Sequence, residues 1–194
     1  MHEPTFEVVI GGMYSGKSTE LVRRLRRLEI SGANVILFKP RVDNRYSEDS
    51  VVTHTGLAHP AVVIDDPSEI WPIVHERLRP HRRIVIGVDE AQFFPPTLYA
   101  ALAEVAKRMN VSVIVAGLDT DFKNEPWPTM IPIVFGCDQL TKLNAVCTEH
   151  GCGSMASRTQ RIVDGKPVTH GDTVLVGATE AYEARCRHCF HGNL

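Results

Sequence analysis

The sequence lacks an apolar run long enough to cross a bilayer, and it lacks a basic N-terminal stretch followed by an apolar segment. We therefore expect no transmembrane helix, no signal peptide and no membrane partner, and we predict a cytoplasmic protein. The sequence also lacks a basic excess, because 21 lysines and arginines face 23 aspartates and glutamates, for a formal net charge of −2. This balance gives no sign of a duplex nucleic-acid partner, and we predict none.

Cysteine is scarce and unevenly placed. Of five cysteines in 194 residues, four lie in two close pairs near the C-terminus, and Cys137 stands alone. In a reducing cytoplasm such pairs favour metal binding over disulfides. A chain of this length can bury one ordinary core, or one core with a small appendage.

Apolar segments of two kinds alternate along the first part of the chain. Short β-prone runs predict strands at 5–10, 33–38, 61–64, 84–88 and 111–116. Apolar residues at helical spacing predict helices around 21–28, over 68–78 and around 98–109. This alternation predicts an α/β fold, a parallel sheet with helices on both faces.

Two segments depart from this alternation. Residues 40–60 are polar and irregular, which predicts a loop with a short hairpin. After about residue 140, turns, cysteines and short strand-like pieces dominate. We therefore predict two domains, an α/β domain over 1–140 and a small domain over 141–194 that needs a staple because it cannot build a large core.

A phosphate-binding loop follows the first predicted strand. The pattern G-x-x-x-x-G-K-[ST] is matched in full by Gly11, Gly12, Met13, Tyr14, Ser15, Gly16, Lys17 and Ser18. The glycines let backbone N–H groups turn toward phosphate oxygens, and the following helix adds the positive end of its dipole. Lys17 would bind the β- and γ-phosphates and Ser18 would bind Mg²⁺. The loop therefore predicts ATP and Mg²⁺ as cofactors.

Two acidic residues follow the apolar strand 84–88. A carboxylate at the end of a strand beside a phosphate loop can reach Mg²⁺, which suits Asp89. Glu90 has no obvious structural task and could act as general base toward the group that attacks the γ-phosphate. If that group is water, the protein is an ATPase; if it is a substrate hydroxyl, the protein is a kinase. The two acids alone do not decide between these.

The four paired cysteines have the pattern of a structural metal site. Cys147-x4-Cys152 and Cys186-x2-Cys189 supply four thiolates, a set that suits tetrahedral Zn²⁺ and leaves no open position for catalysis. His150 and His188 lie within the two knuckles and could substitute as ligands. We treat Cys137 as a small core residue.

These segments together resemble the type II thymidine kinases, which include the cytosolic vertebrate enzyme and many bacterial ones. The resemblance runs over nearly the whole chain and is carried by GGMYSGKSTELVRRL, FKPRVDNRY, VVTHTG, VDEAQFF, GLDTDFKNEPW, LTKLNAVC, TQR and VGATEAYEARCRHC. It implies a P-loop, RecA-like sheet with a small zinc-binding domain. It also implies an enzyme that transfers the γ-phosphate of ATP to the 5′-hydroxyl of thymidine, and of deoxyuridine, in pyrimidine salvage.

The resemblance also implies roles for single residues. Glu90 is similar to the catalytic base, and Asp43 and Arg45 to a loop pair near phosphates and magnesium. The implied nucleoside-binding residues are Met13 and Leu118 near the thymine methyl, Phe93 and Phe122 at the base, Leu175, Val176 and Gly177 at the pyrimidine edge, and Tyr182 near the sugar. A flat base needs aromatic faces and a few backbone hydrogen bonds, so these residue types are reasonable.

One departure from the family concerns the first knuckle, where its members usually have C-x2-C. Counting back from Thr159-Gln160-Arg161 favours Cys152 as the ligand, whereas counting forward from Cys147 places His150 there. We prefer Cys152. The family further implies a homotetramer and feedback inhibition by thymidine triphosphate.

Two other interpretations stay open from the sequence. A P-loop ATPase related to the recombinase fold would need DNA-contacting loops and usually a basic face. A zinc-ribbon nucleic-acid module would need exposed basic and aromatic residues, and Arg185, Arg187 and His188 meet this need only weakly.

Overall fold

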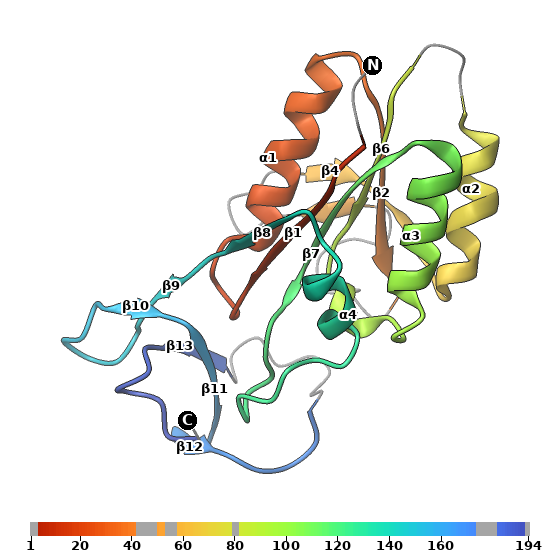
Figure 1. Cartoon of the computed structure of the whole chain (residues 1–194). Coiled ribbons are helices and arrows are strands. Elements are labelled where there is room, and N and C mark those ends of the chain that lie inside the picture. Colours follow the sequence, from red (N-terminus) through yellow and green to blue (C-terminus); the bar gives the residue numbers. More distant parts are fainter. Residues whose placement is uncertain (1–3, 42–49, 53–57, 79–81, 174–181, 193–194) are drawn as a thin grey trace.

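The computed structural model describes residues 4–41, 50–52, 58–78, 82–173 and 182–192. A six-stranded sheet with helices forms the larger part, and small antiparallel sheets near the C-terminus form the rest (Figure 1). In the described residues, no helix has the length and apolarity needed to span a membrane.

Every neighbouring pair of strands in the large sheet is parallel. In sheet order the strands are β5 (Val62–Ile64), β2 (Asn34–Pro40), β6 (Ile84–Val88), β7 (Ser112–Leu118), β1 (Phe6–Gly11) and β8 (Gln139–Lys142). Because all the strands run the same way, their carboxyl ends lie along one edge of the sheet. The segments after β1, β6 and β7 therefore meet there, as in other open α/β sheets that bind ligands at this edge.

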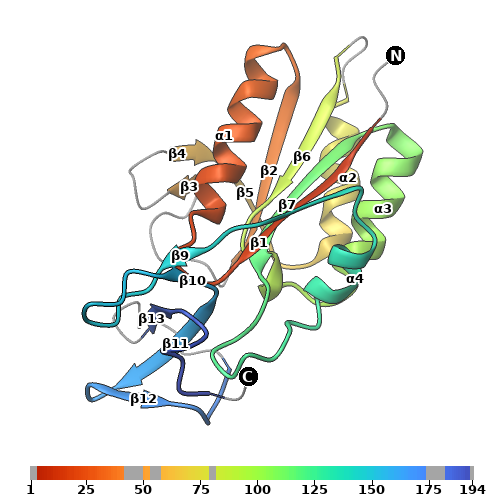
Figure 2. The same ribbon diagram turned by 60° about the vertical axis from the view of Figure 1, so that its left-hand side comes forward.

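Helices cover both faces of the sheet (Figure 2). α1 (Lys17–Ile30) packs Leu21 and Leu25 on one face, against aliphatic residues of β1, β2, β6 and β7. Gly87 allows this approach, because a Cβ there would come within 2.7 Å of Leu25 Cδ1. The other face is covered by α2 (Ile70–Glu76), α3 (Leu98–Met109) and α4 (Met130–Phe135). The predicted α/β fold, with its parallel sheet and helices on both faces, is confirmed.

The short elements agree with the predictions in part. β3 (Ser50–Val52) pairs with β4 (Ala58–Pro60) in antiparallel fashion, as the hairpin prediction required. The helix predicted over 68–78 is instead a 3₁₀ turn, η1 (Pro67–Glu69), followed by the shorter α2. Asp66 and Glu69 form a capping box at that turn, with Pro67 at its start, which explains where the segment begins.

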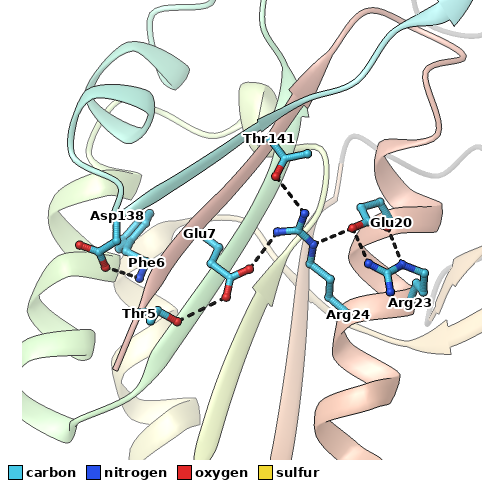
Figure 3. Close-up of polar contacts among 8 residues, drawn as sticks. All are labelled: Thr5, Phe6, Glu7, Glu20, Arg23, Arg24, Asp138 and Thr141. Atoms are coloured by element: carbon cyan, nitrogen blue, oxygen red, sulfur yellow. Dashed lines mark hydrogen bonds and ion pairs between the residues drawn. The ribbon is translucent and has the colours of Figure 1, made fainter. Parts of the chain in front are cut away.

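β8 and α4 were not predicted from the sequence. β8 is an edge strand with mostly exposed side chains, so it shows little apolar pattern. Polar contacts also attach it to the sheet (Figure 3). The Phe6 amide donates to Asp138 at 2.7 Å. Arg24 of α1 donates to Glu7 of β1 at 2.8 Å and to Thr141 of β8 at 2.9 Å, so it links the two strands. The division predicted at residue 140 crosses this strand, and the two-domain organisation stays a prediction.

The C-terminal part consists of short antiparallel strands. β9 (Ala145–Val146) pairs with β10 (Met155–Ala156), and β11 (Arg158–Val163) lies between β12 (Lys166–Val168) and β13 (Tyr182–Arg185). The buried apolar cluster here is small and is made of three alanines and two cysteines, with two more cysteines packed against it.

Candidate active site

The phosphate loop connects β1 to α1 at the carboxyl edge of the sheet. Gly16 caps the start of α1 with φ 85°, a left-handed conformation that favours glycine. A Cβ at Gly11 would overlap the carbonyl oxygen of Leu143, so the loop begins where backbone approaches backbone. Lys17 is nine-tenths buried and its Nζ donates to the Gly12 carbonyl at 2.8 Å. The lysine ammonium is therefore held over the loop, where phosphate would bind.

Asp89 lies at the end of β6 beside this loop, and only 3% of its surface is exposed. Burial and then the charge of Glu90 raise the pKa of Asp89, while hydrogen bonds from Ser18 and the Glu90 backbone and the charge of Lys17 oppose the rise, which leaves the pKa at about 7. A divalent cation would stabilise the carboxylate that burial disfavours. Asp89 and Ser18 thus form an oxygen donor pair that fits Mg²⁺.

Glu90 has a strained backbone at the same edge. Its φ of 49° and ψ of 40° are left-handed, which is uncommon for a residue other than glycine. Its backbone N–H donates to Asp89 Oδ1 at 3.0 Å, and its carboxylate accepts from Gln92 Nε2 at 2.5 Å. The turn sends the two neighbouring carboxylates into different surroundings, Asp89 toward Ser18 and Glu90 toward Gln92. They can therefore have different chemical tasks.

The predicted nucleoside residues that the structure describes lie around the same edge, in two groups. Phe93 follows Glu90 and contacts the Trp127 ring edge to face, with centroids 5.8 Å apart. Phe122 is 2% exposed and follows β7, which ends with Leu118. Tyr182 begins β13 in the C-terminal part.

Arg161 of β11 joins Phe122 to Tyr182. Its guanidinium carbon lies 3.7 Å from the Phe122 ring centroid, and it donates to the Tyr182 hydroxyl at 2.6 and 3.2 Å. It also donates to the carbonyls of Asp172 and Thr173 at 2.6 and 3.1 Å. Sequence reasoning used this arginine only to align the TQR motif and assigned it no role. No spacing rule could have revealed it, because its partners are spread along the chain from Phe122 to Tyr182.

The phosphate loop itself touches the C-terminal part. The Met13 amide donates to Thr159 Oγ1 at 3.0 Å, and the Tyr14 hydroxyl donates to the Tyr182 carbonyl at 3.1 Å. The candidate phosphate site and the candidate nucleoside site are therefore adjacent. Of the predicted site residues, Asp43, Arg45, Leu175, Val176 and Gly177 lie outside the described residues.

The four paired cysteines come together in space. Their sulfur atoms all lie within 4.8 Å of one another, and the group is Cys147, Cys152, Cys186 and Cys189 without His150 or His188. The Cys152 and Cys186 sulfurs are 3.8 Å apart, which matches the edge of a tetrahedron with metal–sulfur bonds of about 2.3 Å. The sulfur positions thus fit a single four-coordinate metal ion.

The ionisation of these thiols also favours a metal. Hydrogen bonds from Ser154 lower the pKa of Cys152 to about 6, whereas contact with the Cys186 thiol raises the pKa of Cys189 to about 12. One thiol therefore ionises readily and another resists. A bound cation would overcome this resistance, because it stabilises thiolates that otherwise repel one another.

Three distant likenesses to solved structures accompany this geometry. The genome packaging NTPase B204 from Sulfolobus turreted icosahedral virus 2, solved with ATP-gammaS, is 17% identical with a TM-score of 0.49, over 73% of this chain and 75% of that one. The complex of the same NTPase with sulfate is 17% identical with a TM-score of 0.48, over 78% of each chain. A DnaB-like replicative helicase is 10% identical with a TM-score of 0.44, over 61% of this chain, which spans 39% of the helicase chain.

The match to a family model is far more extensive. The model described as thymidine kinase matches residues 4–190, which include the phosphate loop, the Asp89-Glu90 pair and all four paired cysteines. The chain is therefore a phosphotransferase, and it belongs to the thymidine kinase family.

Proposed function

We propose that the protein transfers the γ-phosphate of ATP to the 5′-hydroxyl of thymidine, and also of deoxyuridine, in pyrimidine salvage. The observation that carries this proposal is the division of the two acids after β6. Asp89 is buried against Ser18 of the phosphate loop, whereas Glu90 is turned toward Gln92 by its left-handed backbone. A kinase needs both a metal-binding acid and a separate acid for the substrate hydroxyl.

The transfer itself divides among the residues of this edge. Glu90 accepts the proton of the 5′-hydroxyl as that oxygen bonds to the γ-phosphorus. The bond from the γ-phosphorus to the bridging oxygen breaks, and ADP leaves with the electron pair. Lys17 and the loop amides stabilise negative charge on the phosphates throughout. Ser18 and Asp89 would hold Mg²⁺, which would supply positive charge to the phosphates, and the family resemblance implies that Asp43 and Arg45 also serve the phosphates and the metal.

The nucleoside would bind between the two parts of the chain. Phe93 and Phe122 would line the base, and Met13 and Leu118 would form an apolar niche for the 5-methyl group. The backbone of 175–177 would contact the pyrimidine edge, and Tyr182 the sugar. The contacts of Arg161 with Phe122 and Tyr182 support this placement, because they hold two of these aromatic residues together.

We also propose that the four cysteines bind structural Zn²⁺, with Cys152 rather than His150 as fourth ligand. A set of four sulfurs is typical of zinc and leaves no position for substrate. A cytoplasmic location belongs to the same proposal, because close cysteine pairs that bind metal are typical of reducing compartments. Homotetramer formation and inhibition by thymidine triphosphate belong to the same proposal. A nucleoside extended by phosphates could occupy the adjacent nucleoside and phosphate sites at once.

The test is a panel of nucleosides assayed with ATP and Mg²⁺ for formation of the 5′-monophosphate. Thymidine should be a good acceptor and deoxyuridine a measurable one, while ATP hydrolysis without nucleoside should be slow. Hydrolysis that is independent of any nucleoside would identify an ATPase and refute the proposal. DNA should not stimulate turnover.

The role of Glu90 is tested by Glu90→Gln. Because general bases contribute about 10²–10⁴-fold and phosphoryl transfer depends more on positioning, we expect kcat to fall by roughly 10²- to 10³-fold. Binding of an ATP analogue should stay nearly unchanged. Glu104→Gln on the exposed face of α3 is a matched control, because Glu104 is exposed and pairs with Arg108 of the same helix. Near-normal turnover of Glu90→Gln would remove Glu90 from the mechanism.

A further inference from the structure

A buried glutamine lies between the candidate base and the end of β7. Gln92 belongs to the 3₁₀ turn η2 (Ala91–Phe93) and is only 3% exposed. Its side-chain amide makes two hydrogen bonds: Oε1 accepts from the Leu118 backbone N–H at 3.0 Å, and Nε2 donates to Glu90 Oε2 at 2.5 Å. A buried amide satisfied on both sides is held firmly, because either lost bond leaves an unpaired polar group.

The two partners fix which way the amide points. A backbone N–H can only donate, so the atom facing Leu118 must be the oxygen. The NH₂ group must then face Glu90, where its partner is an acceptor. The hydrogen bond from the Gln92 amide holds one oxygen of the Glu90 carboxylate in place.

Backbone features on both sides are consistent with this arrangement. At Gly117, next to Leu118, a Cβ would lie 2.8 Å from Met130 Sδ and 3.1 Å from Gln92 Oε1, so glycine leaves room for both side chains. Glu90 has a left-handed backbone, a conformation that is unfavourable for a residue with a side chain. The hydrogen bond from Gln92 and the turn bond from the Phe93 amide to the Glu90 carbonyl at 3.1 Å hold it there.

We propose that Gln92 is a positioning residue for phosphoryl transfer, which orients the Glu90 carboxylate toward the acceptor hydroxyl by anchoring it to the backbone of Leu118. The inference rests on the proposed function, in which Glu90 is the base. It extends that function by tying the base to the strand end that would contact the thymine ring. The Gln92 side-chain amide would then set the distance between Glu90, at the hydroxyl end of the nucleoside site, and Leu118, at the base end.

The test is a double-mutant cycle between positions 92 and 90. Gln92→Met keeps the volume of the side chain and removes both hydrogen bonds, so we expect kcat to fall by about 10-fold or more, in line with bonds to charged groups. The KM for ATP should stay within about twofold. In a Glu90→Gln background the same substitution should cost less than about threefold, because its effect acts through the carboxylate that is already gone.

Gln160→Met is the matched control. Gln160 is also a fully buried glutamine, and its Oε1 accepts from the His191 amide at 2.9 Å while its Nε2 donates to the Val168 carbonyl at 3.2 Å. Neither of these bonds involves Glu90 or Leu118. Whatever activity Gln160→Met loses should be lost equally in both backgrounds. If Gln92→Met does not fold, Gln92→Asn serves instead, since its shorter amide can reach only one partner.

The possible outcomes distinguish the role of Gln92 from the proposed kinase function. If thymidine is phosphorylated, Glu90→Gln is impaired and Gln92→Met shows full kcat or an additive loss, then Gln92 has no positioning role and only the inference fails. If Glu90→Gln turns over normally, Glu90 is not the base, and the inference fails while the kinase function stands. If thymidine is not an acceptor, the proposed function fails, and the inference fails with it. Loss of kcat by Gln92→Met that disappears in the Glu90→Gln background supports the inference.

Discussion

The two parts of this molecule are held together by different means. The large sheet buries two large apolar clusters, one on each face. The apolar cluster of the C-terminal part consists of three buried alanines and two buried cysteines, and Phe190 is buried besides. Its buried residues are instead often polar: Thr159, Gln160, Arg161 and Arg185 are each at most 7% exposed.

This difference bears directly on the active site, because the site lies where the two parts meet. The phosphate loop and the two acids are positioned by the apolar sheet. Tyr182 and Arg161, in contrast, come from strands whose positions depend on hydrogen bonds and on four sulfur atoms. We expect the phosphate half of the site to be robust and the nucleoside half to depend on metal.

The largest expected effect is that of metal removal. A strong chelator should abolish thymidine binding, because in small metal sites the binding energy of the ion is also folding energy. Binding of an ATP analogue should weaken but persist, since the sheet keeps its own core while the loop loses its contacts from Thr159 and Tyr182. Separate titrations of the two ligands measure this. Parallel loss of both would show that the two parts fold as one unit.

The ligand set can be tested in the same experiments. Purified protein should contain about one zinc per chain. Cys152→Ser should release the metal and His150→Ala should retain it, because the four sulfurs form the compact group and His150 is not in it. Release of zinc by the histidine change alone would mean that the fourth ligand is wrongly assigned.

Lys17→Met, at the start of α1, should be the most damaging single change in the part of the molecule built on the large sheet. It keeps the buried aliphatic stem and removes the charge over the loop, so we expect phosphoryl transfer to fall on the order of 10³-fold with any acceptor. Zinc content and melting temperature should stay close to those of the parent protein. Substantial kinase activity in this variant would contradict the role of the phosphate loop. The loss of thymidine binding on metal removal could then no longer be compared with ATP binding at this loop.

Arg161→Met should have an intermediate effect that is confined to the nucleoside half. The change leaves the Asp172 and Thr173 carbonyls and the Tyr182 hydroxyl without their donor and removes the cation from the Phe122 ring. We expect the KM for thymidine to rise about 10-fold while the KM for ATP changes little. Equal effects on both would show that Arg161 supports the whole junction and not the nucleoside site.

The smallest expected effect is on the α1 side of the sheet and depends on pH. Hydrogen bonds from Arg23 and then Arg24, together with their charges, lower the pKa of Glu20 from 4.5 to about 2 (Figure 3). A depressed acid stabilises the fold above its unfolded pKa, and this stability is lost as pH falls from 4.5 toward 2. Glu20→Gln should therefore lower stability at pH 7 by about 1 kcal/mol.

Urea unfolding at several pH values gives the measurement for Glu20. The difference between the variant and the parent protein should shrink as pH falls through the window and vanish near pH 2. A difference that is constant with pH would assign the effect to lost packing and not to charge. The same variant should bind zinc normally, since Glu20 lies on the sheet side of the molecule.

The sequence by itself determined the parts of this protein that depend on local pattern. Buried strands and amphipathic helices follow from the spacing of apolar residues, and the phosphate loop follows from glycines and a lysine at fixed offsets. The two cysteine knuckles are likewise local, and their residue types predicted a metal site. The family could be inferred for the same reason, because its motifs are short and contiguous.

Only the tertiary structure decided how these pieces meet. β8 carries almost no apolar signal, and its place beside β1 depends on Arg24, Glu7 and Thr141, which are far apart in the chain. The contact of Arg161 with Phe122 and the bond of Gln92 to the Leu118 backbone N–H are equally invisible in the sequence. A hydrogen bond between distant segments has no periodicity, and its partner is a backbone group or ring that every sequence offers many times. Such contacts form only after hydrophobic packing has brought the strand ends to one edge.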